Sequence, residues 1–373
     1  MKITIIGAGP VGCYTGYLLA EQGHKVTIIE EHETIGLPFQ CTGIVSSEFA
    51  DIIKIKRSFL KNTIKKARIY SPEHNYFELK FSKANYVLDR TKLDQHLARK
   101  AQKSGVKILT QHRFIGYDKD TSKAKVKELK TSKEKELKTD ILIGADGPKS
   151  SVAKATGLIK NYNEVEYWTG MQARLKLYNA NVVEFYPHHG SYSWVVPENK
   201  NIVRIGTVAE KDVAKCFQKF LEERIGSKQE VKARLIDKQA GLIPKYKHKR
   251  KLQSKDQQIF LVGDAAGQIK ALTGGGLVPG LMGAEVLAIS LHSPMSYQSL
   301  VKKILGPNMI INNLMRKALD NFSEKDYNDL IRRFNKPKVR AILENTERDF
   351  PLRYVFKLLI KQPGLLKYVS KVI

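Results

Sequence analysis

A short apolar run at the start of the chain turns directly into a glycine-rich fingerprint, GAGPVG at residues 7–12. Residues 3–6 are expected to form a strand buried on both faces, followed by a tight turn and a helix. Gly7 permits the turn, Gly9 lets the backbone approach a pyrophosphate, and Gly12 lets the helix pack closely on the strand. The unpaired N–H groups and positive dipole end of such a helix favour phosphate. The pattern predicts a nucleotide-binding βαβ unit.

An acidic residue, Glu30, ends the second expected strand, residues 25–30. A carboxylate at this place can accept hydrogen bonds from both hydroxyls of an adenosine ribose. Strand, helix, second strand and acid therefore occur in the order that dinucleotide binding requires. The alternative is a tight structural turn that holds no ligand.

The composition is that of a globular protein, because 373 residues with 42% hydrophobic content can form two domains or one large composite. The three cysteines, Cys13, Cys41 and Cys216, are too widely spaced for a disulfide framework or a zinc cluster, so we expect a reducing compartment and no metal site. No signal peptide and no run of about 18 apolar residues is evident. We expect a cytoplasmic protein, or one bound peripherally at the inner face of a membrane.

The formal net charge of +27 calls for an explanation. A nucleic acid, an anionic membrane, an acidic substrate or a generally lysine-rich composition would each account for it. Residues 118–139 alternate lysines with acids, which predicts an exposed hairpin. Residues 245–251, KYKHKRK, contain no acid and are equally suited to a phosphate site or a solvated loop.

The end of the chain has the pattern of a basic amphipathic helix. Such a helix either packs on the body of the protein or lies on a membrane interface. Helical spacing places one apolar and one basic set on different faces: Leu352, Val355, Phe356 and Leu359, and Arg353, Lys357 and Lys361.

The pattern of apolar and polar residues predicts two kinds of strand. Residues 106–109, 141–144 and 259–262 are short apolar runs that end at glycine or polar residues, as strands of a parallel sheet do. Residues 60–86 and 162–240 instead alternate apolar and polar side chains, which favours an antiparallel sheet with one face covered.

These patterns predict an α/β fold, or α+β composite, in which a Rossmann-type domain is interrupted by an antiparallel-sheet substrate domain and followed by a helical C-terminal region. The expected ranges are 1–60, 86–160 and 255–290 for the first domain, 61–85 and 161–254 for the second, and 291–373 for the helical region.

Two later segments carry further chemistry. Asp264 lies among small residues in GDAAG, residues 263–267, where its carboxylate can accept the hydroxyls of a polyol. Downstream, residues 274–276 are three glycines that open another helix. N–H groups at this helix start would stabilise negative charge on a reduced flavin. Otherwise the three glycines form a flexible loop.

Taken together, GAGPVG with Glu30, Asp89-Arg90, GADG at 144–147 and GDAAG resemble FAD-dependent oxidoreductases built like aromatic hydroxylases. Within this group, the chain resembles the geranylgeranyl reductase family, particularly the archaeal enzymes that saturate the digeranylgeranylglycerol chains of membrane phospholipids. Three segments carry that likeness, which extends over about residues 1–290: PFQCTGI at 38–44, YSWVVP at 192–197, and residues 263–283.

The resemblance implies that FAD is the cofactor and that Cys41, Tyr192 and Trp194 are catalytic. Cys41 either places the substrate or flavin or is a small packed residue. The two aromatic rings either stabilise positive charge on the reacting alkene or line an apolar tunnel. The implied FAD contacts are Gly7, Gly9, Val11, Gly12, Glu30, Cys41, Thr42, Ile44, Arg90, Phe114, Asp264, Gly276 and Leu277.

The implied partners are an isoprenoid lipid substrate and an electron donor. No second glycine-rich βαβ unit is evident, so NAD(P)H, a ferredoxin or another carrier remain candidates for the donor. Peripheral contact with an anionic membrane is an open alternative, and nucleic acid is not expected. The alternative functions are an FAD-dependent monooxygenase of the aromatic hydroxylase type, and a basic binding protein that keeps a nucleotide fold without catalysis.

Overall fold

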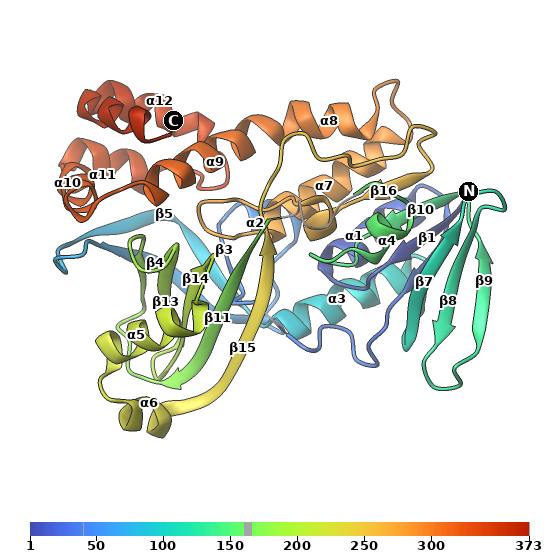
Figure 1. Ribbon diagram of the computed structural model, residues 1–373, viewed down its shortest axis with the longest axis horizontal. Coiled ribbons are helices and arrows are strands. Elements are labelled where there is room, and N and C mark those ends of the chain that lie inside the picture. Colours follow the sequence, from blue (N-terminus) through green and yellow to red (C-terminus); the bar gives the residue numbers. More distant parts are fainter. Residues whose placement is uncertain (40, 160–165, 373) are drawn as a thin grey trace.

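The computed structural model describes residues 1–39, 41–159 and 166–372. Gln40 of the PFQCTGI segment, residues 160–165 at the predicted domain boundary, and Ile373 lie outside the described residues. A five-stranded parallel sheet forms one half of the molecule (Figure 1). Its strands in spatial order are β16 (Ile259–Leu261), β10 (Ile141–Gly144), β1 (Lys2–Ile6), β2 (Lys25–Ile29) and β6 (Lys107–Leu109).

The apolar runs found in the sequence are confirmed as the strands of this parallel sheet. They are almost continuously apolar because both faces of the sheet are covered. On one side pack α1 (Pro10–Glu21), α3 (Arg90–Lys103) and α7 (Leu277–Ser290). A three-stranded antiparallel sheet, which contains the predicted exposed hairpin, shares the same core and consists of β7 (His112–Asp118), β8 (Lys123–Glu128) and β9 (Glu134–Lys138).

The second half of the molecule is built on an eight-stranded sheet (Figure 1). Its strand pairs are antiparallel except for β12 with β4, which is parallel and departs from the expected all-antiparallel sheet. Its strands in spatial order are β15 (Leu235–Pro244), β11 (Tyr167–Lys176), β14 (Ile202–Ala209), β13 (Tyr192–Asn199), β12 (Val182–Tyr186), β4 (Leu60–Tyr70), β5 (Tyr76–Leu88) and β3 (Ile44–Val45).

Strand alternation gives this large sheet two different faces. Val195 on β13 and Ile205 on β14 pack with Phe217 and Phe220 of α5 (Val213–Ile225), which covers the outer face together with α6 (Lys228–Arg234). The inner face carries the side chains between these, among them Trp194. The division of the chain into domains stays a prediction, while the combination of a parallel sheet, a second sheet and a helical end confirms the expected fold class.

The helical region begins at α7 and continues along one side of the molecule to the C-terminus (Figure 1). Short elements join the larger ones: α2 (Phe49–Ile52), α4 (Ser151–Ala155) and the 3₁₀ turn η2 (Gly263–Ala266). The C-terminal helices are α8 (Tyr297–Ile304), α9 (Gly306–Asp320), α10 (Glu324–Phe334), α11 (Pro337–Glu344), α12 (Leu352–Lys361) and the 3₁₀ helix η3 (Pro363–Lys371).

Only part of the apolar stripe selected from the sequence packs on the body, because Val355 and Leu359 contact the buried cluster while Phe356 does not. Tyr354 and Leu358 are buried, whereas Phe356 of the expected stripe is 60% exposed and Ile360 is 73% exposed. The buried pair faces a cluster that includes Val339 of α11. Neighbouring helices therefore decide which side of α12 is covered, and helical spacing alone does not reveal them.

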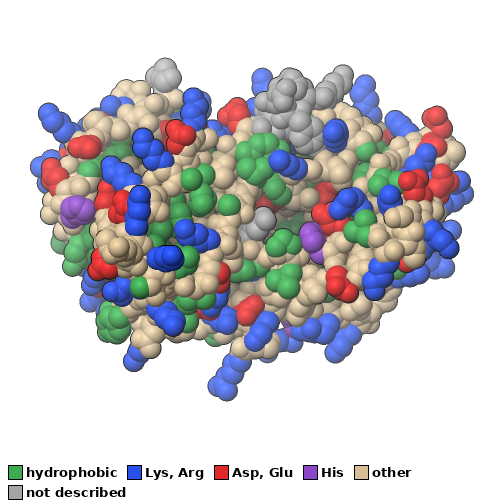
Figure 2. All heavy atoms as spheres, turned by 60° about the horizontal axis from the view of Figure 1, so that its bottom comes forward, with side chains coloured by type: hydrophobic (Ala, Val, Ile, Leu, Met, Phe, Trp, Pro, Cys, Tyr) green, Lys and Arg blue, Asp and Glu red, His purple; other side chains and the backbone are tan. Residues whose placement is uncertain are grey.

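Charge is distributed widely over the surface. Figure 2 shows Lys and Arg side chains spread across one face with Asp and Glu among them. Within the KYKHKRK segment, Lys245 and Lys247 form ion pairs with Glu166, and Lys245 also pairs with Glu210. These contacts tie the segment to neighbouring acids, which favours the solvated-loop interpretation over a phosphate site.

Candidate active site

The glycine fingerprint forms a close junction between β1 and α1. Gly7 has φ of +102°, and a Cβ at this position would collide with the carbonyl oxygen of Ala145. A Cβ on Gly12 would collide with the carbonyl oxygen of Gly7. Gly9 differs, since nothing lies within 4 Å of the Cβ it lacks. No side chain caps the N-terminus of α1. The start of α1 thus has unpaired N–H groups next to open space at Gly9, as pyrophosphate binding requires.

The carboxylate of Glu30 points back towards this junction. Its Oε2 accepts a hydrogen bond from the amide of Ala8 at 2.8 Å, and its Oε1 accepts one from the amide of His32 at 2.9 Å. β7 begins beside Glu30, because the amide of His112 donates to the Glu30 carbonyl oxygen at 2.9 Å. Phe114 lies two residues further along, and its side chain is buried in the core.

The GDAAG segment and the start of α7 lie against α1. A Cβ on Gly280 would lie 2.8 Å from Val11 Cγ2, and one on Gly263 would lie 3.3 Å from the same side chain. Beside them, Asp264 Oδ1 is 2.9 Å from the position of a Cβ on Gly276. Burial raises the pKa of Asp264 to about 6, although Arg90 opposes this. These approaches bring three separate segments of the chain together at the start of α1.

Arg90 joins this group from the first turn of α3. Its Nε and Nη2 both donate to the Asp94 carboxylate at 3.2 Å. Burial alone lowers the pKa of Arg90, but the nearby Asp94 and Cys41 raise it above its usual range. The Cys41 sulfur accepts a hydrogen bond from the amide of Gly43 at 3.3 Å. The predicted catalytic cysteine thus adjoins the predicted FAD contact Arg90.

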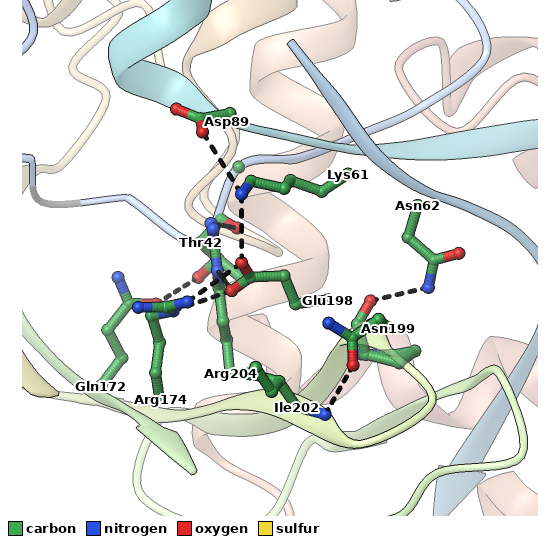
Figure 3. Close-up of polar contacts among 12 residues, drawn as sticks. Thr42, Lys61, Asn62, Asp89, Gln172, Arg174, Glu198, Asn199, Ile202 and Arg204 are labelled. Carbon is green, nitrogen blue, oxygen red and sulfur yellow. Dashed lines mark hydrogen bonds and ion pairs between the residues drawn. The ribbon is translucent and has the colours of Figure 1, made fainter. Parts of the chain in front are cut away.

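A buried polar network holds the turn that follows Cys41 (Figure 3). Arg204, which is only 4% exposed, donates to the carbonyl oxygen of Thr42 and to Glu198. The Thr42 hydroxyl donates to the side chain of Gln172 at 2.9 Å. Thr42 is therefore fixed to the large sheet through both its main chain and its side chain.

The same network reaches the segment that carries Arg90. Glu198 pairs with Arg174 at 2.8 Å and with Lys61 at 3.6 Å (Figure 3). Lys61 also lies 3.4 Å from Asp89, which caps α3 by accepting from the amide of Lys92. Sequence reasoning identified Asp89 in the Asp89-Arg90 pair but missed Lys61, Arg174, Glu198 and Arg204. For Arg204, the available signal is a charged side chain inside a strand that is otherwise apolar.

The other end of the inner face is aromatic. Tyr192 and Trp194 have ring centroids 5.8 Å apart, and Phe185 lies 5.7 Å from Tyr192. The Tyr192 hydroxyl fills the space where Gly274 lacks a side chain, in the loop that opens α7. The buried indole N–H groups of Trp168 and Trp194 have no hydrogen-bond partner among the described residues. The structure thus brings the predicted aromatic pair to the glycine loop beside Gly276 and Leu277.

The comparison with known families identifies the class of protein that this fold and candidate site define. The model of the FAD binding domain family matches residues 1–298, so the chain belongs to this family, and FAD is its cofactor. The geometry fits this group, because Gly9 faces open space at an uncapped helix start and Glu30 is turned towards it.

Relatives within this family share almost the full length of the chain. A digeranylgeranylglycerophospholipid reductase from Methanocaldococcus jannaschii is 28% identical over 98% of this chain and 96% of that protein. A solved structure of a geranylgeranyl bacteriochlorophyll reductase-like protein from Thermoplasma acidophilum matches with a TM-score of 0.83 and 24% identity, and covers 100% of this chain and 99% of that one. The family resemblance found in the sequence is thus confirmed.

The fold also occurs in flavoproteins with different chemistry. The flavin-dependent halogenase CmlS matches with a TM-score of 0.70 at 14% identity, over 98% of this chain and 78% of that one. Fold alone therefore does not select a reaction. Within the described ranges, no helix combines the length and apolar character needed to cross a membrane.

Proposed function

We propose that this protein is an FAD-dependent reductase that saturates isolated double bonds in isoprenoid chains, in membrane lipids or their precursors. The observation that carries the proposal is the aromatic cluster of Tyr192, Trp194 and Phe185, placed against the Gly274 loop at the start of α7. The near full-length relatives named as digeranylgeranylglycerophospholipid reductases support the same reaction and substrate class.

The chemistry of an isolated alkene explains why an apolar aromatic site suits this reaction. When bound, FAD supplies the hydride. An isolated trisubstituted alkene has no carbonyl group to accept electron density, so a proton must be added as well, and positive charge develops on carbon. The faces of Tyr192 and Trp194 would stabilise that charge by about 2 kcal/mol or more in a site that excludes water. The same rings position the alkene.

The polar residues of the candidate site would hold the cofactor. The start of α1 at Gly9 would bind the pyrophosphate, and Glu30 would accept the ribose hydroxyls. Asp264 would accept hydroxyls of the ribityl chain. Arg90 and the Cys41 turn would border the flavin, where Cys41 would position flavin or substrate. The unpaired indole donors of Trp168 and Trp194 are available to a polar group of the substrate.

Mass spectrometry of the lipid tests this function. The FAD-loaded protein is reduced with dithionite without oxygen and mixed with detergent-dispersed digeranylgeranylglycerophospholipid. We expect the lipid mass to rise by two hydrogens for each double bond saturated, and free FAD with dithionite is the control. Unchanged lipid in the presence of the yellow, reducible protein would contradict the proposal. Addition of oxygen atoms in air would instead indicate a monooxygenase.

The oxidised cofactor must be reduced again after each turnover, so a reducing partner is part of the proposal. NAD(P)H, a ferredoxin and other carriers can be compared by measuring which of them bleaches the flavin in the absence of oxygen. A carrier that reduces the bound flavin and sustains lipid saturation without dithionite would be identified as the electron donor.

A further inference from the structure

The outermost part of the C-terminal region carries an apolar surface that no other part of the described chain covers. We call it the C-terminal apolar face, and it consists of Phe356 and Ile360 on α12 with Leu366 and Val369 on η3. These side chains are 60%, 73%, 55% and 54% exposed. Figure 1 shows α12 at the edge of the molecule, with the chain terminus beside it.

The opposite sides of the same two helices are firmly packed. Tyr354 and Leu358 of α12 are buried in one cluster with Leu365 and Tyr368 of η3. The hydroxyl of Tyr368 donates to Asp329 of α10 at 2.7 Å. The exposed face is therefore held in place by a core, which distinguishes it from a frayed terminus.

Every charged side chain within residues 351–373 is basic. Residues 351–373 contain Arg353, Lys357, Lys361, Lys367 and Lys371 and no Asp or Glu. Arg353, Lys367 and Lys371 pair with acids in other segments. Among the described residues, Lys357 and Lys361 form no ion pair, and each follows directly after an exposed apolar residue of the face. Unpaired cations thus alternate with exposed apolar groups along one side of α12.

We propose that the C-terminal apolar face docks on the surface of an anionic lipid bilayer, with α12 lying in the plane of the interface. Apolar side chains that enter the headgroup boundary, flanked by Lys and Arg that attract anionic lipid, define interfacial binding. A second copy of the chain is a poorer occupant, because a symmetric contact would bring the same unpaired lysines together.

A chain of contacts links the segment before α12 to the candidate active site. Asp349 lies three residues before α12, and its carboxylate binds the ammonium group of Lys270 and the hydroxyl of Ser46. The amide of Lys270 donates to the carbonyl oxygen of Gly275 at 3.1 Å, in the loop at the start of α7. The inference deepens the proposed function, since a docked enzyme would take its lipid substrate from the bilayer.

Sedimentation with vesicles tests the docking face without requiring catalysis. At low salt we expect the FAD-loaded protein to bind vesicles that contain phosphatidylglycerol, and to bind vesicles of pure phosphatidylcholine much less. High salt should weaken the binding. The variant Phe356→Ser with Ile360→Ser should lower the partition coefficient at least about tenfold. Lys357→Gln with Lys361→Gln should lower it on anionic vesicles about tenfold.

Matched controls come from other exposed positions. Tyr178→Ser removes an aromatic side chain that is 71% exposed and lies outside the C-terminal region. Lys130→Gln with Lys133→Gln removes two exposed lysines between β8 and β9. Both controls should bind vesicles as the unchanged protein does. The proposal would be overturned if the variant Phe356→Ser with Ile360→Ser bound vesicles as well as the unchanged protein. It would also be overturned if the unchanged protein were a dimer in solution and this variant a monomer, because the face would then bind a second copy of the chain.

Activity in detergent micelles separates this inference from the proposed function. The docking variants should saturate detergent-dispersed lipid at the rate of the unchanged protein and lose activity only on vesicles. If no variant and no unchanged protein reduces the lipid in micelles, the proposed reductase function is wrong, while the vesicle-binding result still decides the docking face.

Discussion

The two sides of the candidate active site are built by different means. On the side of the parallel sheet, the backbone forms the surface, because Gly7 and Gly12 allow contacts that any side chain would block and Gly9 leaves open space. On the side of the eight-stranded sheet, side chains form it, from Arg204 at one end to Trp194 at the other. A backbone surface suits a cofactor common to many proteins, whereas a side-chain surface can select one substrate.

Separate substitutions of Gly9, which precedes α1, and Gly12, which lies within it, should give the largest effects. Gly12→Ala should lower the free energy of unfolding by about 3 kcal/mol, since its Cβ would collide with the carbonyl oxygen of Gly7. Gly9→Val should leave thermal stability of the FAD-free protein unchanged, because its side chain enters open space. It should still weaken FAD binding roughly a hundredfold by occupying the pyrophosphate position.

Thermal melts of the FAD-free proteins and titration with FAD measure both effects. Equal losses of stability in the two variants would show that Gly9 is a packing residue like Gly12. Unchanged FAD affinity in Gly9→Val would show that the pyrophosphate does not bind at this end of α1.

The pH dependence of stability tests the buried carboxylate of Asp264. Burial raises the pKa of Asp264 from 3.8 to about 6 in the folded protein, so the folded state binds the proton more tightly than the unfolded state. Stability should therefore fall as pH rises from about 4 to 6, by up to about 3 kcal/mol from this group. Asp264→Asn should remove that part of the slope. Urea unfolding of the FAD-free proteins measures it, and identical slopes would contradict the assignment.

The aromatic end of the large sheet should affect turnover more than cofactor binding. Trp194→Leu should lower the rate of lipid saturation about thirtyfold, because about 2 kcal/mol of cation–π stabilisation is lost. FAD affinity should not change. Tyr192→Phe is the matched control, since it keeps the ring and should retain nearly full activity. A rise in KM with kcat unchanged in Trp194→Leu would mean that the ring only lines a tunnel.

The polar end should give the smallest effect. Arg204→Lys keeps the charge but loses the guanidinium that joins Glu198 to the carbonyl of Thr42, so we expect about tenfold slower turnover with FAD still bound. Arg224→Lys is the control. Arg224 donates two hydrogen bonds of 2.8 Å to Glu184, in a similar paired contact outside the candidate site. Stopped-flow rates compare the two. Equal slowing would show that the network acts through general stability.

The sequence predicted the backbone side of the candidate active site more completely than the side-chain side. The turn at Gly7, the start of α1 and the acid Glu30 follow one another within a single βαβ unit, so local patterns specify them. The contact between Arg204 and Thr42 joins positions 162 residues apart, and no local pattern encodes it.

Two further features depended on long-range packing. The parallel pairing of β12 with β4 could not be predicted from alternation, because alternation identifies strands without identifying their neighbours. The burial of Tyr354 in place of Phe356 depended on the cluster around Val339. In contrast, the aromatic residues Tyr192 and Trp194 were found through family resemblance, and the structure brings them to the loop at Gly274.

Single-turnover mixing without oxygen tests the central claim most directly. The protein is loaded with FAD and reduced with a stoichiometric amount of dithionite. It is then mixed with detergent-dispersed digeranylgeranylglycerophospholipid while visible absorbance is followed. The account predicts that the yellow colour of oxidised flavin returns as one double bond is saturated for each flavin. Flavin that stays colourless until oxygen is admitted would contradict it.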